Sequence, residues 1–524
     1  MAVPSSIADL DAVAANNSPA GSDAIGTALD DYLRAHASII KQVSQFTQSG
    51  SGAVSSTVET KLRESVSIKD FGAVGNGVAD DGPALQLALN YCKLNTKKLH
   101  ATAGTYLINT AVTISAFAGV HIEGDGINNT LFNKTTAGDM LTLDGCSRGV
   151  ISGIAFSGAG MSSGNGLVIS GAGVGVMNIK DNQFASFPGS GLYLNGTVGN
   201  PFSGMTVSNN VILSCGITSG VAGFRASYCN DFRIIGNQFG TVSIGGSYPI
   251  IGSQLDFCQA GNYSENFHWE NLVGAQFTSC VYSRFIGNRF ETNQREGVKF
   301  IDTSFCTFVG NTIHTNSQGA TNTYDGMSMA NCGQWAITGN NWFEWSGGAT
   351  LMRYCLTTDA SCNTLMISDN LLFGYGTAPA NIASAYEIRL LGNAPLQFGL
   401  DQASNNWFTF NSKVVAAGVT TFCGASGASF TEADVTQVAP KSCVATKLRV
   451  NLGVAPGAGQ TCTVTLRKGG VDTAMAIVLS GAAAYTAEVN GSIPFSDADS
   501  FSLKVVNGAG AASTYVSATL VVDN

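Results

Sequence analysis

Charged residues are scarce in this 524-residue chain, where Asp, Glu, Lys and Arg together make up 12% of the sequence. The 35 acidic residues outnumber the 26 basic ones, and the formal net charge is -9. A nucleic-acid-binding surface needs clustered Lys and Arg, so this composition argues against a nucleic-acid partner. Hydrophobic residues still account for 44% of the chain, which excludes disorder as its main state.

Long apolar runs are also missing. No stretch reaches the roughly 18 uncharged apolar residues of a membrane span, so we expect no membrane insertion. The first residues, MAVPSSIADLDAV, lack the basic and apolar regions of a secretory signal. We therefore expect synthesis and folding in a cytosol.

Common catalytic and redox signatures are absent as well. The sequence has no G-x-S-x-G, no P-loop, no H-E-x-x-H and only five His. Its 13 Cys are an odd number without a C-x-x-C pair, so we expect reduced thiols buried as small hydrophobic side chains. We expect neither a metal ion nor a cofactor.

A short motif, apolar–x–x–Asn–x–apolar, repeats along the middle of the chain. Its seven copies are centred on Asn182, Asn210, Asn237, Asn288, Asn311, Asn340 and Asn370. An eighth copy has Ile154 in the Asn place, and the wide gap before Asn288 predicts one degenerate copy around Asn271. A period of 20–30 residues without helical periodicity indicates a parallel β-helix, in which stacked Asn side chains can form a ladder.

The cysteines support this alignment. The positions eight residues before the motif centres are Cys146, Val174, Phe202, Cys229, Cys280, Thr303, Cys332 and Cys362. Five of these eight are Cys, which indicates one interior column of small side chains repeated at the strand spacing of about 4.8 Å.

Residues 1–60 have a different texture, with an amphipathic helix expected over residues 24–45 and a Ser/Gly/Thr-rich linker after it. The stretch NNSPAGSDAIGTALDDYLRAHASIIKQ resembles the start of many phage tail proteins. The resemblance implies that residues 1–60 attach the protein to the phage tail or baseplate. An ordinary amphipathic helix is the alternative interpretation.

Residues 61–120 contain VSIKDFGAVGNGVADDGPALQLALNYC, which resembles the opening of the pectate-lyase-like β-helix superfamily, including phage tailspikes and polysaccharide depolymerases. Pro83 suits a first helical turn, so a helix over residues 84–94 is expected to cover the end of the β-helix, with Asp80 and Asp81 capping it. The resemblance implies a right-handed solenoid over residues 121–412. It also implies a homotrimeric spike of the virion tail, made in the host cytoplasm and acting at the bacterial surface.

After residue 412 the sequence alternates apolar and polar residues between glycine turns, as in CVATKLRVNLGV and DSFSLKVVNG. This pattern predicts an antiparallel β-sandwich over residues 413–524. It resembles the C-terminal sandwich of phage tail proteins, which implies trimerisation or carbohydrate binding. The expected fold class is therefore all-β, with a short helical N-terminal segment.

Alignment of the repeats places two carboxylates at one corner of adjacent coils. Glu296 and Asp325 each precede Gly and an apolar strand. Two carboxylates about one strand spacing apart repel each other, so one is expected to keep its proton. An acid and a base are what glycoside hydrolysis requires. The alternative is that Glu-Gly and Asp-Gly are simply good turn dipeptides.

Further candidates surround this pair. Glu291 and Glu344 are additional candidate acids, and the expected substrate-binding residues are Arg295, Tyr324, Trp345, Trp269, His314 and Arg353. An irregular insertion between Cys258 and Asn271, carrying Glu265 and Glu270 close to Asp256, is a second candidate site.

The resemblance implies a bacterial capsular polysaccharide or lipopolysaccharide O-chain as the partner of this protein. The leading hypothesis is a hydrolase that cleaves this polymer. A lyase of the same architecture would need a uronic acid and a base such as Arg295, Lys299 or Tyr324. A spike that only adheres to its receptor and a purely structural tail fibre are the other hypotheses.

Overall fold

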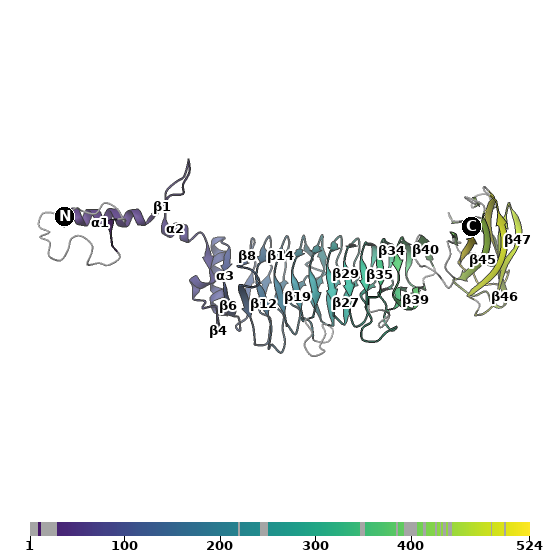
Figure 1. Cartoon of the computed structure of the whole chain (residues 1–524), viewed down its shortest axis with the longest axis horizontal. Helices are drawn as coiled ribbons and strands as arrows, with labels where there is room; N and C mark the ends of the chain where they lie inside the picture. Colours follow the sequence, from purple (N-terminus) through teal and green to yellow (C-terminus); the bar gives the residue numbers. More distant parts are fainter. Residues whose placement is uncertain are drawn as a thin grey trace.

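In the computed structural model, most of the chain is arranged in sequence order along one long axis (Figure 1). The structure describes residues 9–11, 29–217, 221–241, 250–345, 352–383, 386–391, 393, 406–411, 415–424, 427–429, 431–432, 436–438, 443–483, 485–496 and 499–523. An N-terminal helix comes first, then a solenoid of about ten turns, and then a compact group of antiparallel strands.

The solenoid is a right-handed parallel β-helix with three sheets, as expected. The eleven-stranded sheet contains β7 (Val112–Ser115), β10 (Leu141–Asp144), β13 (Leu167–Ser170), β16 (Leu192–Asn195), β20 (Ala222–Ser227), β24 (Ile251–Asp256), β27 (Val273–Thr278), β30 (Val298–Ile301), β33 (Met327–Ala330), β36 (Met352–Thr358) and β39 (Tyr375–Ile382). The thirteen-stranded sheet contains β3 (Val66–Ser67), β5 (Leu99–Ala101), β8 (His121–Gly124), β11 (Val150–Ser152), β14 (Asn178–Lys180), β18 (Thr206–Ser208), β22 (Arg233–Ile235), β25 (Asn262–Ser264), β28 (Arg284–Ile286), β31 (Ser304–Val309), β34 (Gly333–Thr338), β37 (Asn363–Ser368) and β40 (Tyr386–Leu391). The twelve-stranded sheet contains β4 (Asn76–Asp80), β6 (Gly104–Leu107), β9 (Thr130–Asn133), β12 (Ala155–Ser157), β15 (Gln183–Ala185), β19 (Val211–Leu213), β23 (Gln238–Gly240), β26 (Phe267–Trp269), β29 (Arg289–Glu291), β32 (Thr312–His314), β35 (Asn341–Phe343) and β38 (Leu371–Leu372). A short pair, β17 (Phe202–Ser203) and β21 (Cys229–Asn230), joins two coils at a turn.

Alternation along the strands builds the core. In β10, Leu141 and Leu143 are buried while Thr142 and Asp144 are partly exposed. The same positions pair with Leu167 and its neighbours on the next coil, so one hydrophobic core runs along the solenoid.

Asparagines form the predicted ladder between the thirteen-stranded and twelve-stranded sheets. Each Asn donates from Nδ2 to Oδ1 of the Asn on the next coil, at 2.8–3.2 Å. The ladder runs through Asn182, Asn210, Asn237, Asn266, Asn288, Asn311, Asn340, Asn370 and Asn393. The backbone N–H of Ile154 donates to Asn182 and so begins it.

One predicted ladder position is wrong. The copy expected around Asn271 is centred on Asn266, five residues earlier. Asn271 instead begins a second, shorter ladder that continues through Asn293 and Asn316 at another turn of the coil.

The cysteine column is confirmed, and the corrected ladder adds Cys258 to it. The backbone N–H of Cys229 lies 3.4 Å from Sγ of Cys258, and that of Cys332 lies 3.4 Å from Sγ of Cys362. All thirteen cysteines are free and buried. Burial raises the pKa of most of these thiols, for example that of Cys215 to about 12, which makes them poor nucleophiles.

The helix α3 (Gly82–Asn95) covers the first coils, close to the expected range, and packs on β7 and η4 (Ile68–Phe71). Leu85 and Leu89 are buried, whereas Leu87 is exposed. Asp80 accepts from the N–H of Gly82 at the helix start, while Asp81 accepts from the N–H groups of Val74 and Gly75 in the preceding turn. Both carboxylates are structural.

The N-terminal segment contains α1 (Leu29–Val43), β1 (Gln45–Phe46), β2 (Ser56–Thr57) and α2 (Val58–Leu62). Residues 24–28 of the expected helix lie outside the described residues. Among the described residues, no helix is long and apolar enough to cross a membrane.

The C-terminal strands form two antiparallel sheets with a core of their own. One contains β41 (Asn406–Asn411), β45 (Cys443–Leu452), β48 (Thr486–Phe495) and β50 (Val516–Asp523). The other contains β42 (Thr420–Gly424), β43 (Gly427–Ser429), β44 (Gln437–Val438), β46 (Gly457–Lys468), β47 (Val471–Gly481) and β49 (Ser500–Asn507). The antiparallel part thus begins at β41, before residue 413.

Candidate active site

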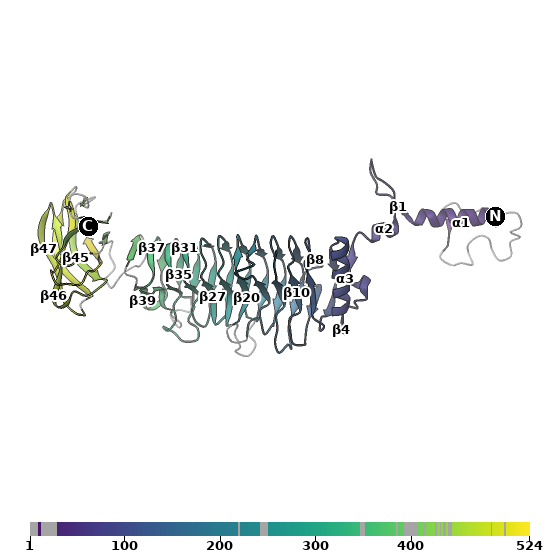
Figure 2. The same cartoon turned by 180° about the vertical axis from the view of Figure 1, so that it is seen from behind.

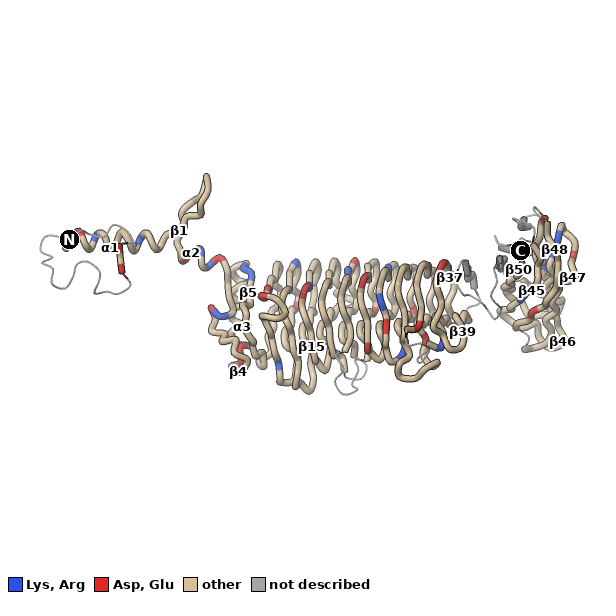
Figure 3. Tube along the Cα trace, viewed as in Figure 1, with Lys and Arg blue, Asp and Glu red and all other residues tan. Residues whose placement is uncertain are grey.

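Most of the predicted site residues lie along one line of turns, which joins the twelve-stranded sheet to the eleven-stranded sheet and is called the corner below. On successive coils the corner consists of residues 270–272, 292–297 and 315–326. Its length therefore varies from coil to coil, and in both views loops leave the solenoid along one edge (Figures 1 and 2). Figure 3 shows how thinly charged positions are spread along the solenoid, so a group of them at the corner is notable.

The predicted stacking of Glu296 and Asp325 is confirmed by the strand pairing. Val298 pairs with Met327, and each acid lies two residues before its strand residue. On the preceding coils, Ala222, Ile251 and Val273 form a small apolar cluster of their own. The N–H of Gly274, next to Val273, donates to the carbonyl oxygen of Glu296 at 3.1 Å. Glu296 therefore occupies the next coil after Val273 in this column of corner residues.

Glu296 has one carboxylate oxygen paired and one unpaired. Its Oε1 lies 3.6 Å from Nζ of Lys299. Its Oε2 is buried and has no hydrogen-bond partner, although 15% of the side chain remains exposed. A buried polar atom without a partner in a native structure calls for an explanation, and a bound ligand is one.

Asp325 is held in a different way, because its side chain is 4% exposed and bound by Arg353. Nε and Nη2 of Arg353 donate to the two carboxylate oxygens at 2.9 and 2.8 Å. The hydrogen bond with Asp325 raises the pKa of Arg353, and the charge of Glu296 adds to this rise. We had expected repulsion between Glu296 and Asp325 to make one of them keep its proton. The positive charge of Arg353 offsets this repulsion, so the repulsion no longer supports that expectation.

Three predicted substrate-binding residues stack on adjacent coils beside these acids. The Arg295 guanidinium lies 5.5 Å from the centre of the Tyr324 ring. The N–H of Arg353 donates to the carbonyl oxygen of Tyr324 at 2.8 Å. Arg295, Glu296, Lys299, Tyr324, Asp325 and Arg353 are called the corner cluster below.

Glu291 and His314 form a second group, at the C-terminal ends of the neighbouring strands β29 and β32. His314 Nε2 lies 2.6 Å from Oε2 of Glu291, and Arg289 also contacts this carboxylate. Burial raises the pKa of Glu291, but the hydrogen bond and charge of His314 and the charge of Arg289 outweigh burial and lower it. Nδ1 of His314 is 3.0 Å from Oγ1 of Thr315. Glu291 is therefore an ion-paired carboxylate.

Aromatic rings flank this second group. Trp269 stacks on Phe267 at 4.8 Å, and the ring of His314 stacks on Phe343 at 4.5 Å. Trp345 is 81% exposed at the corner, which suits a sugar-binding ring, and Glu344 lies beside it in the chain. The structure thus brings Arg295, Glu296, Tyr324, Asp325 and Arg353 together, and places Trp269, Glu291 and His314 on the adjoining sheet.

The prediction that the second candidate site is an irregular insertion is wrong. The residues between Cys258 and Asn271 form a regular coil with β25 and β26. Glu265 and Glu270 occupy left-handed positions with φ of 56° and 53° at its two turns. The segment looked irregular in the sequence because His268 occupies the last position of the repeat motif, where the other copies have an apolar residue.

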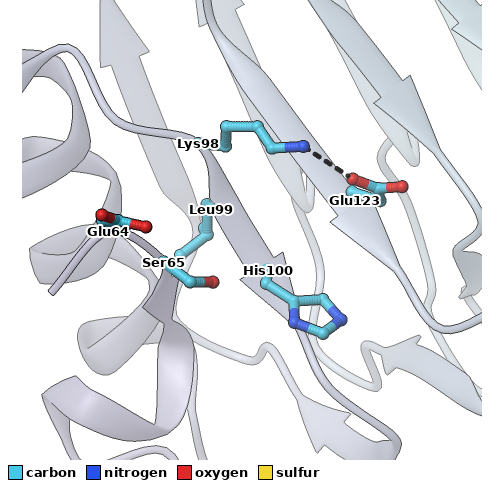
Figure 4. A pocket seen from close by; sticks show the side chains of 6 residues that line it. All are labelled: Glu64, Ser65, Lys98, Leu99, His100 and Glu123. Atoms are coloured by element: carbon cyan, nitrogen blue, oxygen red, sulfur yellow. Dashed lines mark hydrogen bonds and ion pairs between the residues drawn. The ribbon is translucent and has the colours of Figure 1, made fainter. Parts of the chain in front are cut away.

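A cavity of about 200 Å³ lies near the other end of the solenoid, away from all predicted site residues (Figure 4). Glu64, Ser65, Lys98, Leu99, His100 and Glu123 line it. Nζ of Lys98 is 3.3 Å from Glu123 Oε2. This cavity is not part of the corner.

The comparisons with known proteins agree with this architecture. Residues 65–153 match the family model described as rhamnogalacturonase A/epimerase, pectate lyase-like. This match covers the start of the solenoid, whose first coils are therefore similar to a pectate-lyase-like β-helix. No curated protein matches the chain.

Solved structures with this β-helix match at low identity. The A-module of the mannuronan C-5 epimerase AlgE4 from Azotobacter vinelandii is 17% identical, and the match covers 62% of this chain and 94% of the module with a TM-score of 0.52. The Dettilon tailspike protein is 11% identical over 89% of this chain and 96% of its own, with a TM-score of 0.51. Tailspike protein 2 of an Escherichia coli O157:H7 bacteriophage is 13% identical over 90% of this chain and 73% of its own, also with a TM-score of 0.51. At this identity the likeness shows the fold.

The corner cluster combines two carboxylates with three cations on the outside of this β-helix. Glu296 has one carboxylate oxygen without a partner, and Asp325 is fixed in place by Arg353. Sequence reasoning missed the pairing of Asp325 with Arg353 and the contact of Arg289 with Glu291. Alternation along β29 would have placed Arg289 beside Glu291, because the two residues flank the buried Phe290 on the outward face.

Proposed function

We propose that this protein is a phage tailspike that binds a bacterial surface polysaccharide and cleaves it by glycoside hydrolysis at the corner cluster. The observation that carries the proposal is Glu296, whose buried oxygen has no partner and which stacks on the ion-paired Asp325. A pair of carboxyl groups is what most glycosidases use. The tailspike proteins of similar fold support the proposed class.

In this proposal Glu296 gives a proton to the glycosidic oxygen, because its free oxygen can carry that proton towards a substrate. Asp325 is the charged partner, which faces the sugar ring as nucleophile or as base for a water molecule. Arg353 keeps the Asp325 carboxylate in one orientation through two hydrogen bonds. Arg295, Tyr324 and the exposed Trp345 bind the sugar chain on either side.

A polysaccharide lyase is the second candidate, favoured by the cations beside Glu296. Lys299 lies 3.6 Å from this carboxylate, and Arg295 and Arg353 are in the same cluster. A lyase removes a proton next to a uronic acid carboxylate and needs a cation to stabilise the resulting charge. Arg295, Lys299 and Tyr324 are its candidate bases.

The test is incubation of the purified protein with a panel of capsular polysaccharides and lipopolysaccharide O-chains. Reducing ends that appear without ultraviolet absorbance from unsaturated uronates support hydrolysis. Reducing ends together with that absorbance mean a lyase. Binding without either signal means a non-catalytic adhesin and overturns the proposed activity.

The proposal extends to assembly and location. We propose a homotrimer attached to the phage tail through residues 1–60, made in the bacterial cytoplasm and acting at the bacterial surface. The C-terminal sandwich would then hold the trimer together or bind sugar. Two of the similar structures are tailspike proteins, which supports this arrangement.

A further inference from the structure

Five polar side chains form one outward column across adjacent coils of the eleven-stranded sheet. Tyr193 pairs with Arg225, Arg225 with Gln254, Gln254 with Gln276, and Gln276 with Lys299. At about 4.8 Å per coil the column is roughly 19 Å long. Its last member belongs to the corner cluster, so the column leads away from the proposed site along the solenoid.

Arg225 is a cation without a counter-charge in this column. Its guanidinium carbon lies 4.4 Å from the centre of the Tyr193 ring, and it forms no ion pair with any described residue. Its Nε is buried and has no hydrogen-bond partner. Residues 218–220 and 242–249, which come shortly before β20 and β24 in the sequence, contain no Asp or Glu. Burying part of a charge without a partner costs free energy, and an anionic ligand would offset that cost.

Gln254 adds an unpaired acceptor on the next coil. Its Nε2 donates to Oδ2 of Asp256 at 2.8 Å, which fixes the orientation of the amide. Its Oε1 is then left buried without a partner. A donor on Arg225 and an acceptor on Gln254 therefore lie side by side, and a sugar carries both an acceptor and hydroxyl donors.

We infer that this column is a binding subsite for an anionic sugar residue, with Arg225 as its specificity-determining residue. The free Nε edge of the guanidinium can bind a carboxylate or a phosphate with two parallel hydrogen bonds, while Gln254 accepts from a hydroxyl of the same glycan. A neutral sugar would leave the guanidinium without a counter-charge. The inference rests on the proposed function, because it assumes that a polysaccharide lies along this face.

The test uses an array of purified anionic and neutral bacterial polysaccharides, together with carboxyl-reduced and dephosphorylated forms of the anionic ones. Wild-type protein is compared with Arg225→Gln and Arg225→Lys. Arg284→Gln is the matched control, because Arg284 is an exposed arginine on the thirteen-stranded sheet. Circular dichroism and thermal melting check that each variant folds.

We expect the wild type to bind anionic polysaccharides only. Arg225→Gln should weaken that binding by about tenfold or more, Arg225→Lys by less, and Arg284→Gln not at all. On a cleaved polymer, Arg225→Gln should raise KM and leave kcat nearly unchanged. Loss of binding on carboxyl reduction identifies a carboxylate, and loss on dephosphorylation identifies a phosphate.

If the wild type binds a neutral polysaccharide with the same affinity as an anionic one, the inference is overturned and the proposed function is left intact. Unchanged binding by Arg225→Gln has the same consequence. Binding to no polysaccharide of the array overturns the proposed function and this inference together.

Discussion

The three acidic side chains Glu291, Glu296 and Asp325 lie within two adjacent coils, yet their neighbours give them different properties. Glu291 is paired with His314 and Arg289, and Asp325 with Arg353. Glu296 keeps a buried oxygen, Oε2, that has neither a hydrogen-bond nor an ion-pair partner. The repeat spacing in the sequence placed Glu296 and Asp325 at one corner, but it could not reveal the pairing of Asp325 with Arg353. That contact spans 28 residues across turns of irregular length.

A buried histidine in the core makes stability depend on pH. His268 is fully buried next to Tyr263 and Ser253, and burial lowers its pKa from 6.5 to about 3. The unfolded chain therefore binds a proton at this site more readily than the folded one, so the free energy of unfolding should fall as the pH is lowered from about 6.5 towards 3. Urea unfolding at a series of pH values measures this slope.

The matched variant is His268→Phe, because His268 pairs with Phe239 and Phe290 on the adjacent coils. This variant should fold and show a smaller loss of stability over the same pH range. Identical pH slopes for the variant and the wild type would refute the assignment to His268.

At the scale of elements, the asparagine motif predicted the solenoid and most of the main ladder. It missed Asn266 because His268 stands where the motif has an apolar residue. The second ladder has three members among the described residues, Asn271, Asn293 and Asn316, too few to stand out as a repeat. The corner loops were unpredictable in shape because their lengths differ from coil to coil.

The ladder should contribute measurably to stability. Asn288 accepts from the N–H of Asn266 and donates to the carbonyl oxygen of Tyr263 and to Asn311. Asn288→Ala leaves these buried groups without partners, so we expect the free energy of unfolding to fall by about 3 kcal/mol. Chemical denaturation measures the change.

The control for this variant is Asn341→Ala, on the partly exposed face of β35. It should cost less than about 1 kcal/mol. Equal losses for Asn288→Ala and Asn341→Ala would mean that the ladder adds no specific stability.

At the scale of the whole molecule, α1 exposes an apolar stripe. Leu33 and Ile40 are 60% and 66% exposed, and Leu29 lies one turn before Leu33. The helix extends from the N-terminal end of the solenoid (Figure 1). An apolar stripe of this kind is normally covered by another helix, and two further copies of the chain would cover it in a trimer.

We therefore expect analytical ultracentrifugation to give three times the chain mass of 54.1 kDa. Leu33→Glu combined with Ile40→Glu should weaken the assembly if α1 contributes to it, and Leu87→Glu on the exposed side of α3 serves as the control. A stable monomer for the wild type would contradict the trimer.

The most direct test of the central claim is the rate at which Glu296→Gln releases reducing ends from a polysaccharide that the wild type cleaves. We expect a loss of about a hundredfold to ten-thousandfold, with binding and thermal melting nearly unchanged, because a corner residue contributes little to the core. Asp325→Asn should lose activity similarly, whereas Glu291→Gln and Glu344→Gln should retain most of it. Cleavage by Glu296→Gln at the wild-type rate would contradict the account.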